Sequence, residues 1–127
     1  MSHRSRFARL VIDCHTDHVE HAAGFWAETL GHPCEVDEEH NAGYLYMDDH
    51  ALPVVVQGVV QEPRVLLDIE TDDKLAEMER VMHLGAKKLG VFNGAIVMEA
   101  PTGHRFRIVD AHGSGLRESG NYWGEET

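Results

Sequence analysis

Ten histidines in a chain of 127 residues are the first sign of chemistry, because neutral imidazole is the commonest metal ligand in proteins. His15, His18 and His21 follow one another at intervals of three, so two of them could share a helix face and bind a metal. We interpret them instead as solvated residues of a polar face. His104, after Gly103, is expected to cap a turn or to be exposed. Five others lie in expected loops or at a helix end, and none of them forms a ligand motif: His32, His40, His50, His83 and His112.

Nucleophilic catalysis finds no support in the residue pattern. Cys14 and Cys34 are the only cysteines and lack the CxxC spacing of a zinc or redox motif, so we expect buried, reduced thiols. No Ser/His/Asp or Cys/His motif and no glycine-rich phosphate loop is present. The catalytic residues therefore remain unknown at this level.

The charge balance excludes two classes of partner. The formal net charge is -11, from 22 acidic and 11 basic residues, which opposes binding to nucleic acids or to anionic membranes. No apolar run approaches the roughly 20 residues of a membrane span, and Met1 to Arg6 lacks the apolar stretch of a secretory signal. We expect a soluble, cytoplasmic protein that folds as one domain over residues 1–127.

An internal repeat provides the elements that must position any site. Arg9 to His18 matches Arg64 to Asp73 without a gap, sharing Arg, Asp, Thr and Asp. A helical stripe follows each copy. The first stripe begins after an Asp17–Glu20 capping box and ends at Gly31, and the second begins after Asp72 and ends at Gly85. Phe25 and Trp26 in the first stripe are expected to pack in the core.

Three shorter strand patterns follow each helix, so the sequence predicts two tandem βαβββ units of an α+β fold. The first unit covers about 7–62 and the second about 63–110, with Glu62-Pro63 between them. The expected strands, separated by turns that include Asp48 to His50, are 34–38, 44–47, 52–60, 87–91, 95–99 and 105–109. We expect a loop-like tail over 111–127, in which Tyr122 and Trp123 pack on the parent domain, on a second subunit or over a pocket.

Several short motifs occur in one order along the chain. They are Arg9 to Asp13, Phe25-Trp26, Leu30-Gly31, Arg64 to Asp68 and Glu99 to Phe106. In this order, and with the duplicated unit, the chain resembles the glyoxalase-like domain of the vicinal-oxygen-chelate (glyoxalase/bleomycin-resistance/dioxygenase) superfamily from about residue 7 to residue 110. The resemblance implies that each unit curls into half of a cup around one cavity and that the chain forms a homodimer.

The resemblance also implies where a divalent metal would be held, with one ligand from the first and one from the last strand of each unit. In the second unit these positions fall on Leu66 and on Arg107, four residues after Gly103. A leucine cannot coordinate a cation, and the permanent charge of a guanidinium repels one.

In the first unit the corresponding positions fall on Arg9 or Val11 and on Val55 or Gln57, depending on the register. Only the amide of Gln57 could touch a cation, and weakly. We therefore predict no metal and no other cofactor, and a ligand pocket lined by six residues: Arg9, Val11, Val55, Gln57, Leu66 and Arg107.

Arg9 and Arg107 suggest what that pocket could bind. Two buried guanidiniums need partners, either carboxylates, for which Asp13 and Asp68 are candidates, or a small anionic ligand such as a carboxylate or phosphate. If Arg107 lies on the outer face of the sheet, the anion hypothesis fails.

The resulting hypothesis is a glyoxalase-like protein that binds a small organic molecule in its cup without a catalytic metal, either sequestering it or acting on it. One alternative is a metal-dependent lyase, isomerase or dioxygenase of the superfamily. Another is a collapsed cup that serves only as an interaction module. No substrate is identified by the sequence.

Overall fold

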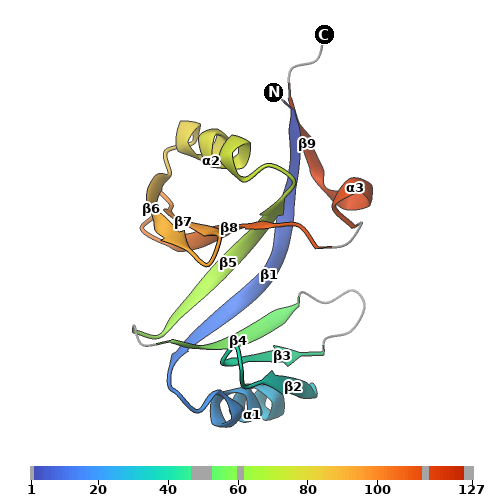
Figure 1. Cartoon of the computed structure of the whole chain (residues 1–127), viewed down its shortest axis with the longest axis vertical. Helices are drawn as coiled ribbons and strands as arrows, with labels where there is room; N and C mark the ends of the chain where they lie inside the picture. The colour runs from blue at the N-terminus through green and yellow to red at the C-terminus, as the bar shows by residue number, and fades with distance from the viewer. Residues whose placement is uncertain (1, 47–52, 60–61, 113–114, 125–127) are drawn as a thin grey trace. The chain divides into compact units, whose positions relative to one another are not determined.

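The computed structural model describes residues 2–46, 53–59, 62–112 and 115–124. The predicted α+β fold is confirmed, with two strand–helix–three-strand runs in chain order (Figure 1). The turn expected at Asp48 to His50 lies outside the described residues. The first run is β1 (His3–His15), α1 (Val19–Leu30), β2 (Cys34–Asp37), β3 (Ala42–Leu45) and β4 (Val54–Val59). The second is β5 (Arg64–Thr71), α2 (Lys74–His83), β6 (Lys87–Phe92), β7 (Ala95–Glu99) and β8 (Arg105–Asp110), followed by α3 (Gly115–Ser119) and β9 (Asn121–Trp123).

The chain divides into two compact units. The α1 unit comprises Arg9–Leu66, and the α2 unit comprises Met1–Ala8 together with Leu67–Thr127. The strand β1 therefore contributes its first residues to the α2 unit and its last residues to the α1 unit. No helix in the described ranges is both long and apolar enough to cross a membrane.

In the α1 unit, the sheet is ordered β2-β3-β4-β1, and β1 and β4 run parallel. Helix α1 packs on one face, beside β2, β3 and β4 (Figure 1). The buried core on that face consists of Ile12, Val19, Ala23, Leu45, Val54 and Val56. Trp26 packs against this core as expected, but Phe25 is 60% exposed because it lies on the outer side of α1.

In the α2 unit, β5 pairs in parallel with β8, and β6, β7 and β8 are antiparallel neighbours. Helix α2 contacts β8 and β6. The core beneath it consists of Val81, Ala86, Ile96, Met98 and Ile108, with Met78 and Phe106 at its edge. The side chains of β7 and β8 that face this core alternate with others on the opposite face, as in any half-buried strand.

The start of each helix differs by one residue from the prediction. Helix α1 begins after His18, whose side chain makes no capping hydrogen bond. The hydroxyl of Thr16 accepts the backbone N–H of His18 at 2.9 Å and orients the chain just before the helix. Helix α2 is capped by Asp73, which accepts the backbone N–H of Ala76 at 3.1 Å. The expected cap, Asp72, instead accepts the backbone N–H of Arg4 at 2.8 Å.

The buried face of α2 also differs from the predicted apolar stripe. Val81 is buried, but Leu75 and Leu84 are 65% and 68% exposed. A glutamate, Glu77, is fully buried in their place. Helix α2 is thus held in its unit by the apolar contact of Val81 and by the charged contacts of Glu77.

The expected loop over 111–127 is wrong for two segments. Helix α3 buries Leu116, and β9 pairs antiparallel with His3–Ser5 of β1. The indole of Trp123 donates a hydrogen bond to Ser5, so this aromatic packs on the parent domain.

Candidate functional site

The four positions expected in the α1 unit lie on the sheet face opposite α1. Parallel pairing places Val11 beside Val55 and Asp13 beside Gln57. Their neighbours in the strands pack against α1, so alternation turns Val11, Val55 and Gln57 away from it, and the same parity applies to Arg9. Val11 is fully buried, and the others are partly exposed. This face offers apolar side chains together with the Gln57 amide, the Arg9 guanidinium and the Asp13 carboxylate, which has the same parity.

Leu66, the last residue of the α1 unit, is 7% exposed. Its side chain carries no atom that could coordinate a metal or donate a hydrogen bond. It can contribute only apolar contact to a binding surface.

Arg107 is bound by Asp68 in the α2 unit. The guanidinium donates from Nε to Oδ1 and from Nη2 to Oδ2, both at 2.7 Å. The Asp68 side chain is fully buried, and that of Arg107 is 19% exposed. This two-point geometry is among the strongest of charge-assisted hydrogen bonds. Of the two kinds of partner that the sequence left open for Arg107, the structure provides the carboxylate.

The register of β5 and β8 decides which face Arg107 occupies. Asp68 pairs with Arg107, and Ile69 pairs with Ile108. Because Ile108 belongs to the core beneath α2, Arg107 lies on the face opposite the helix. It therefore does not lie on the helix-covered face of the sheet.

The donor set at the six expected positions does not fit a divalent metal. Zinc, iron and manganese sites are built from imidazole, carboxylate or thiolate groups, and none of these occurs at the six positions. The nearby carboxylate of Asp68 already accepts hydrogen bonds on both oxygens from Arg107. No reaction step through a metal can be derived for these residues.

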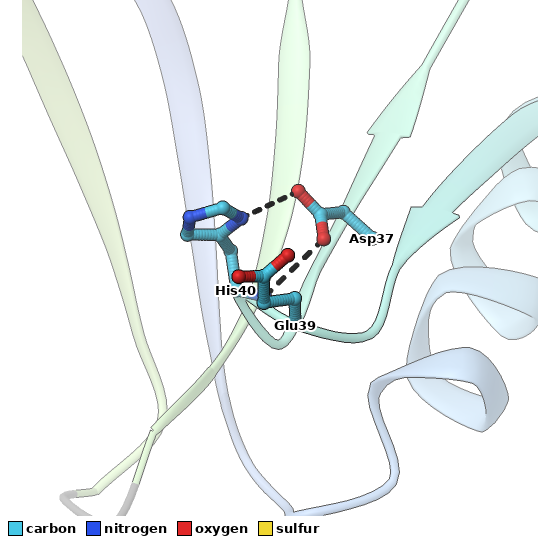
Figure 2. A group of neighbouring side chains, drawn as sticks. All are labelled: Asp37, Glu39 and His40. Carbon is cyan, nitrogen blue, oxygen red and sulfur yellow. Dashed lines mark hydrogen bonds and ion pairs between the residues drawn. The ribbon is translucent and has the colours of Figure 1, made fainter.

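A different group of possible donors lies at the turn between β2 and β3. The ligand atoms of Asp37, Glu39 and His40 lie within 4.8 Å of one another (Figure 2). His40 Nδ1 lies 2.7 Å from Asp37 Oδ2, and the His40 backbone N–H donates to Asp37 Oδ1 at 3.3 Å. The hydrogen bond with His40 lowers the pKa of Asp37, and the bond with Asp37 raises the pKa of His40.

This turn group is on the surface, where water competes for every ligand atom. The His40 side chain is 70% exposed and that of Asp37 is 36% exposed. The bonds from His40 also stabilise the turn, in which Asn41 has a φ of 50°. The sequence places His40 in a loop without a ligand motif, and only its spacing from Asp37 and Glu39 indicates the group.

A hollow of about 600 Å³ lies beside the same turn. Its walls are four carboxylates, one aromatic ring and one aliphatic side chain: Glu20, Glu35, Asp37, Glu38, Tyr44 and Val36. None belongs to the six expected residues. Four carboxylates repel an anion, so a ligand that entered this hollow would be neutral or cationic.

The remaining candidates for chemistry are the two cysteines and four of the histidines considered from the sequence. Burial raises the pKa of Cys14, which packs against the α1 core and is thus a poor nucleophile. Both cysteines are free thiols. His15, His18 and His21 are exposed, as expected for a polar face, and His104 is exposed beside the Thr102 hydroxyl at 2.9 Å.

Three solved structures share this fold at low sequence identity. A 2,2',3-trihydroxybiphenyl 1,2-dioxygenase from Sphingomonas wittichii strain RW1 is 14% identical over 86% of this chain, with a TM-score of 0.56. The chain spans 42% of that dioxygenase. A methylmalonyl-CoA epimerase from Mycobacterium tuberculosis is 13% identical, with 89% of this chain and 91% of the epimerase covered and a TM-score of 0.54.

The third is a glyoxalase/bleomycin resistance protein/dioxygenase superfamily member from Vibrio splendidus 12B01. It is 16% identical, with 82% of this chain and 97% of the other covered and a TM-score of 0.53. No curated protein matches the sequence significantly. The family model of the glyoxalase-like domain matches residues 9–109, which cover both runs except the first residues of β1 and the last residue of β8. The chain belongs to the glyoxalase-like domain family.

Proposed function

We propose that this protein binds a small organic molecule and does so without a divalent metal at the family's ligand positions. Membership of the glyoxalase-like family supports small-molecule binding. The observation that carries the metal-independent part is the bond between Arg107 and Asp68 in the α2 unit.

The electrostatic reason is the fixed charge of Arg107. Two unit charges roughly 4 Å apart interact by about 4 kcal/mol at an effective dielectric constant of about 20, and a divalent ion doubles this to about 8 kcal/mol. Asp68 offsets part of the repulsion, but its two oxygens are already used by the guanidinium. A metal at the position of Arg107 would gain no ligand and would meet a cation.

The ligand we propose is a small organic molecule. Whether it is an anion is tested by comparing the affinities of charged and neutral probes. An anionic ligand would compete with Asp68 for Arg107, since both present acceptor oxygens to the same guanidinium. Acetate and pyruvate should then bind more tightly than acetamide, and the difference should grow in Asp68→Asn. Equal affinities for the charged and neutral probes would exclude an anion site at Arg107.

The metal-independent part is tested by calorimetric titration of probe ligands into protein treated with a chelator. The first probes are those just named, followed by a panel of small aromatic acids and phenols. We expect the affinity of any binding probe to be the same with and without added chelator, because a chelator removes metal only from a site that holds one. Binding that appears only after manganese, iron, nickel or zinc is restored would support the metal-dependent lyase, isomerase or dioxygenase instead.

Self-association belongs to the same proposal, because the family resemblance implies a homodimer. Light scattering coupled to size-exclusion chromatography measures the mass directly. Twice the mass of the chain is the expected result, and the mass of one chain across the micromolar range would contradict it.

A further inference from the structure

The two ends of the described chain are joined beside α2. Strand β9 pairs antiparallel with the start of β1, with His3 opposite Trp123 and Ser5 opposite Asn121. All of these residues belong to the α2 unit. The pairing covers three residues, which is too short to be stable without side-chain support.

A buried carboxylate lies beneath this junction. Glu77 of α2 is fully buried and accepts hydrogen bonds from Arg80 at both oxygens, at 2.8 Å each, and from His3 Nε2 at 2.8 Å. A buried charge is tolerated only when it is paired and hydrogen-bonded in this way. The bond to His3 ties α2 to the first residues of β1.

Trp123 links the junction to the carboxylate from the other side. Its indole Nε1 donates to the Ser5 hydroxyl at 2.8 Å, and the Arg80 guanidinium lies 4.0 Å from its ring centroid. One side chain of β9 therefore supports both the strand next to it and the cation that neutralises Glu77. Cation–π contacts of this kind strengthen when they are partly desolvated.

A second layer of contacts continues along the same segment. The Arg4 guanidinium lies 5.0 Å from the Tyr122 ring, and Arg6 binds both Ser119 and Glu70. Leu116 of α3 is buried. The segment from α3 to β9 thus contacts β1 at Arg4, Ser5 and Arg6.

We infer that residues 115–124 act as a clasp that holds the first residues of β1 over Glu77 and thereby fixes α2 in its unit. With the clasp closed, the Glu77 carboxylate and His3 are shielded from water, while the Arg80 side chain stays 26% exposed. With the clasp open, Arg80 and His3 are no longer held against Glu77, and α2 keeps only its apolar contact. The inference concerns the α2 unit alone and does not depend on the proposed function.

A glycine permits a test that removes none of the contacting side chains. A methyl group at Gly120 would lie 2.4 Å from the Leu116 carbonyl oxygen, so Gly120→Ala must displace the connection between α3 and β9. In the matched control, Gly24→Ala, the added methyl would meet nothing within 4 Å in α1. Both are substitutions of one glycine by alanine in a segment that the structure describes.

Hydrogen exchange followed by mass spectrometry measures the outcome in each helix separately. In Gly120→Ala we expect exchange in α2 peptides (Lys74–His83) to accelerate at least about fivefold, with α1 peptides (Val19–Leu30) unchanged. Gly24→Ala should leave α2 exchange unchanged. The inference is overturned if exchange in α2 peptides stays unaltered although exchange in β9 accelerates. It is also overturned if exchange in α1 and α2 accelerates equally.

A milder variant covers the case in which Gly120→Ala does not fold. Trp123→Phe keeps an aromatic ring beneath Arg80 but lacks the N–H that binds Ser5. Acceleration of α2 exchange by roughly threefold is expected from the loss of one hydrogen bond. No change in this variant and in Ser5→Ala would show that β9 does not support α2.

Discussion

The bond between Arg107 and Asp68 offers the sharpest quantitative prediction. The two side chains meet through two hydrogen bonds of 2.7 Å, and Asp68 has no exposed surface. We therefore consider Asp68→Asn and Arg107→Met together with the double variant. Each single change removes one partner of a mostly buried pair, whereas the double change replaces both.

The expected magnitudes follow from the burial of the pair. Breaking a buried ion pair from one side typically costs about 3–5 kcal/mol of unfolding free energy, because the other charge stays buried. Arg107 is partly exposed, so we expect the lower end, about 3 kcal/mol for each single variant. The double variant should cost less than the sum of the two, with a coupling energy of roughly 2–3 kcal/mol.

Urea unfolding at pH 7, followed by circular dichroism, measures all four proteins of the cycle. Unchanged denaturant slopes would show that the same unfolding transition is compared. A control cycle between Asp68 and Arg105, which lies two residues before Arg107 on the same strand, should show no comparable coupling. A coupling energy below about 0.5 kcal/mol between Asp68 and Arg107 would refute the reasoning.

Three further predictions concern single sites. Burial raises the pKa of Glu77, but hydrogen bonds from its partners outweigh burial and hold that pKa below 4.5. The stability that ionised Glu77 contributes is therefore lost as the pH falls below 4.5. In Glu77→Gln, the urea midpoint should depend less steeply on pH in this acidic range. The raised pKa of His40 should fall back toward 6.5 in Asp37→Asn, as read from its ring resonances in an NMR titration; a pKa unaffected by the substitution would contradict the turn geometry. Gly43→Ala would place a methyl 2.6 Å from the Ala23 side chain, so it should lower the unfolding free energy by about 1–3 kcal/mol in thermal or urea unfolding, and a neutral effect would show that α1 and β3 are packed less closely.

The repeated sequence was sufficient to predict the order of the elements from β1 to β8. Arg9 to His18 and Arg64 to Asp73 match without a gap, and both copies begin the strand–helix–strand runs found in the structure. Which side chains of β1 and β4 face the helix was left open by one residue of register, because both strands carry continuous apolar runs rather than an alternation. Such local, periodic signals follow from burial on one face and are visible in a single sequence.

The features that escaped prediction depend on contacts between distant residues. Glu77 was not expected inside, because a glutamate is normally exposed unless partners from elsewhere neutralise it, here Arg80 and His3. Strand β9 has three residues and shows no alternation of its own. It forms because the Trp123 indole donates a hydrogen bond to Ser5, which is far away in the sequence. The choice of Asp73 over Asp72 as helix cap likewise depends on Arg4.

The sequence named Asp68 as a candidate partner of Arg107 but could not choose between a carboxylate and a ligand. Strand parity places Val11, Val55 and Gln57 on the face opposite α1, as a register argument from sequence can foresee. The pairing of Arg107 with Asp68 required the parallel register of β5 and β8, which no local pattern specifies. The turn group around Asp37 escapes sequence analysis because Asp37 falls in the expected strand 34–38, whereas His40 falls in an expected loop.

The central claim is that this family member binds its ligand without a metal at the expected positions. Titration of manganese, nickel and zinc into chelator-treated protein, monitored by calorimetry, tests it directly when the surface group is removed by Asp37→Ala and His40→Ala. The account predicts no stoichiometric site of micromolar or tighter affinity in that double variant. One ion bound per chain with such affinity, and lost on Gln57→Ala, would contradict it.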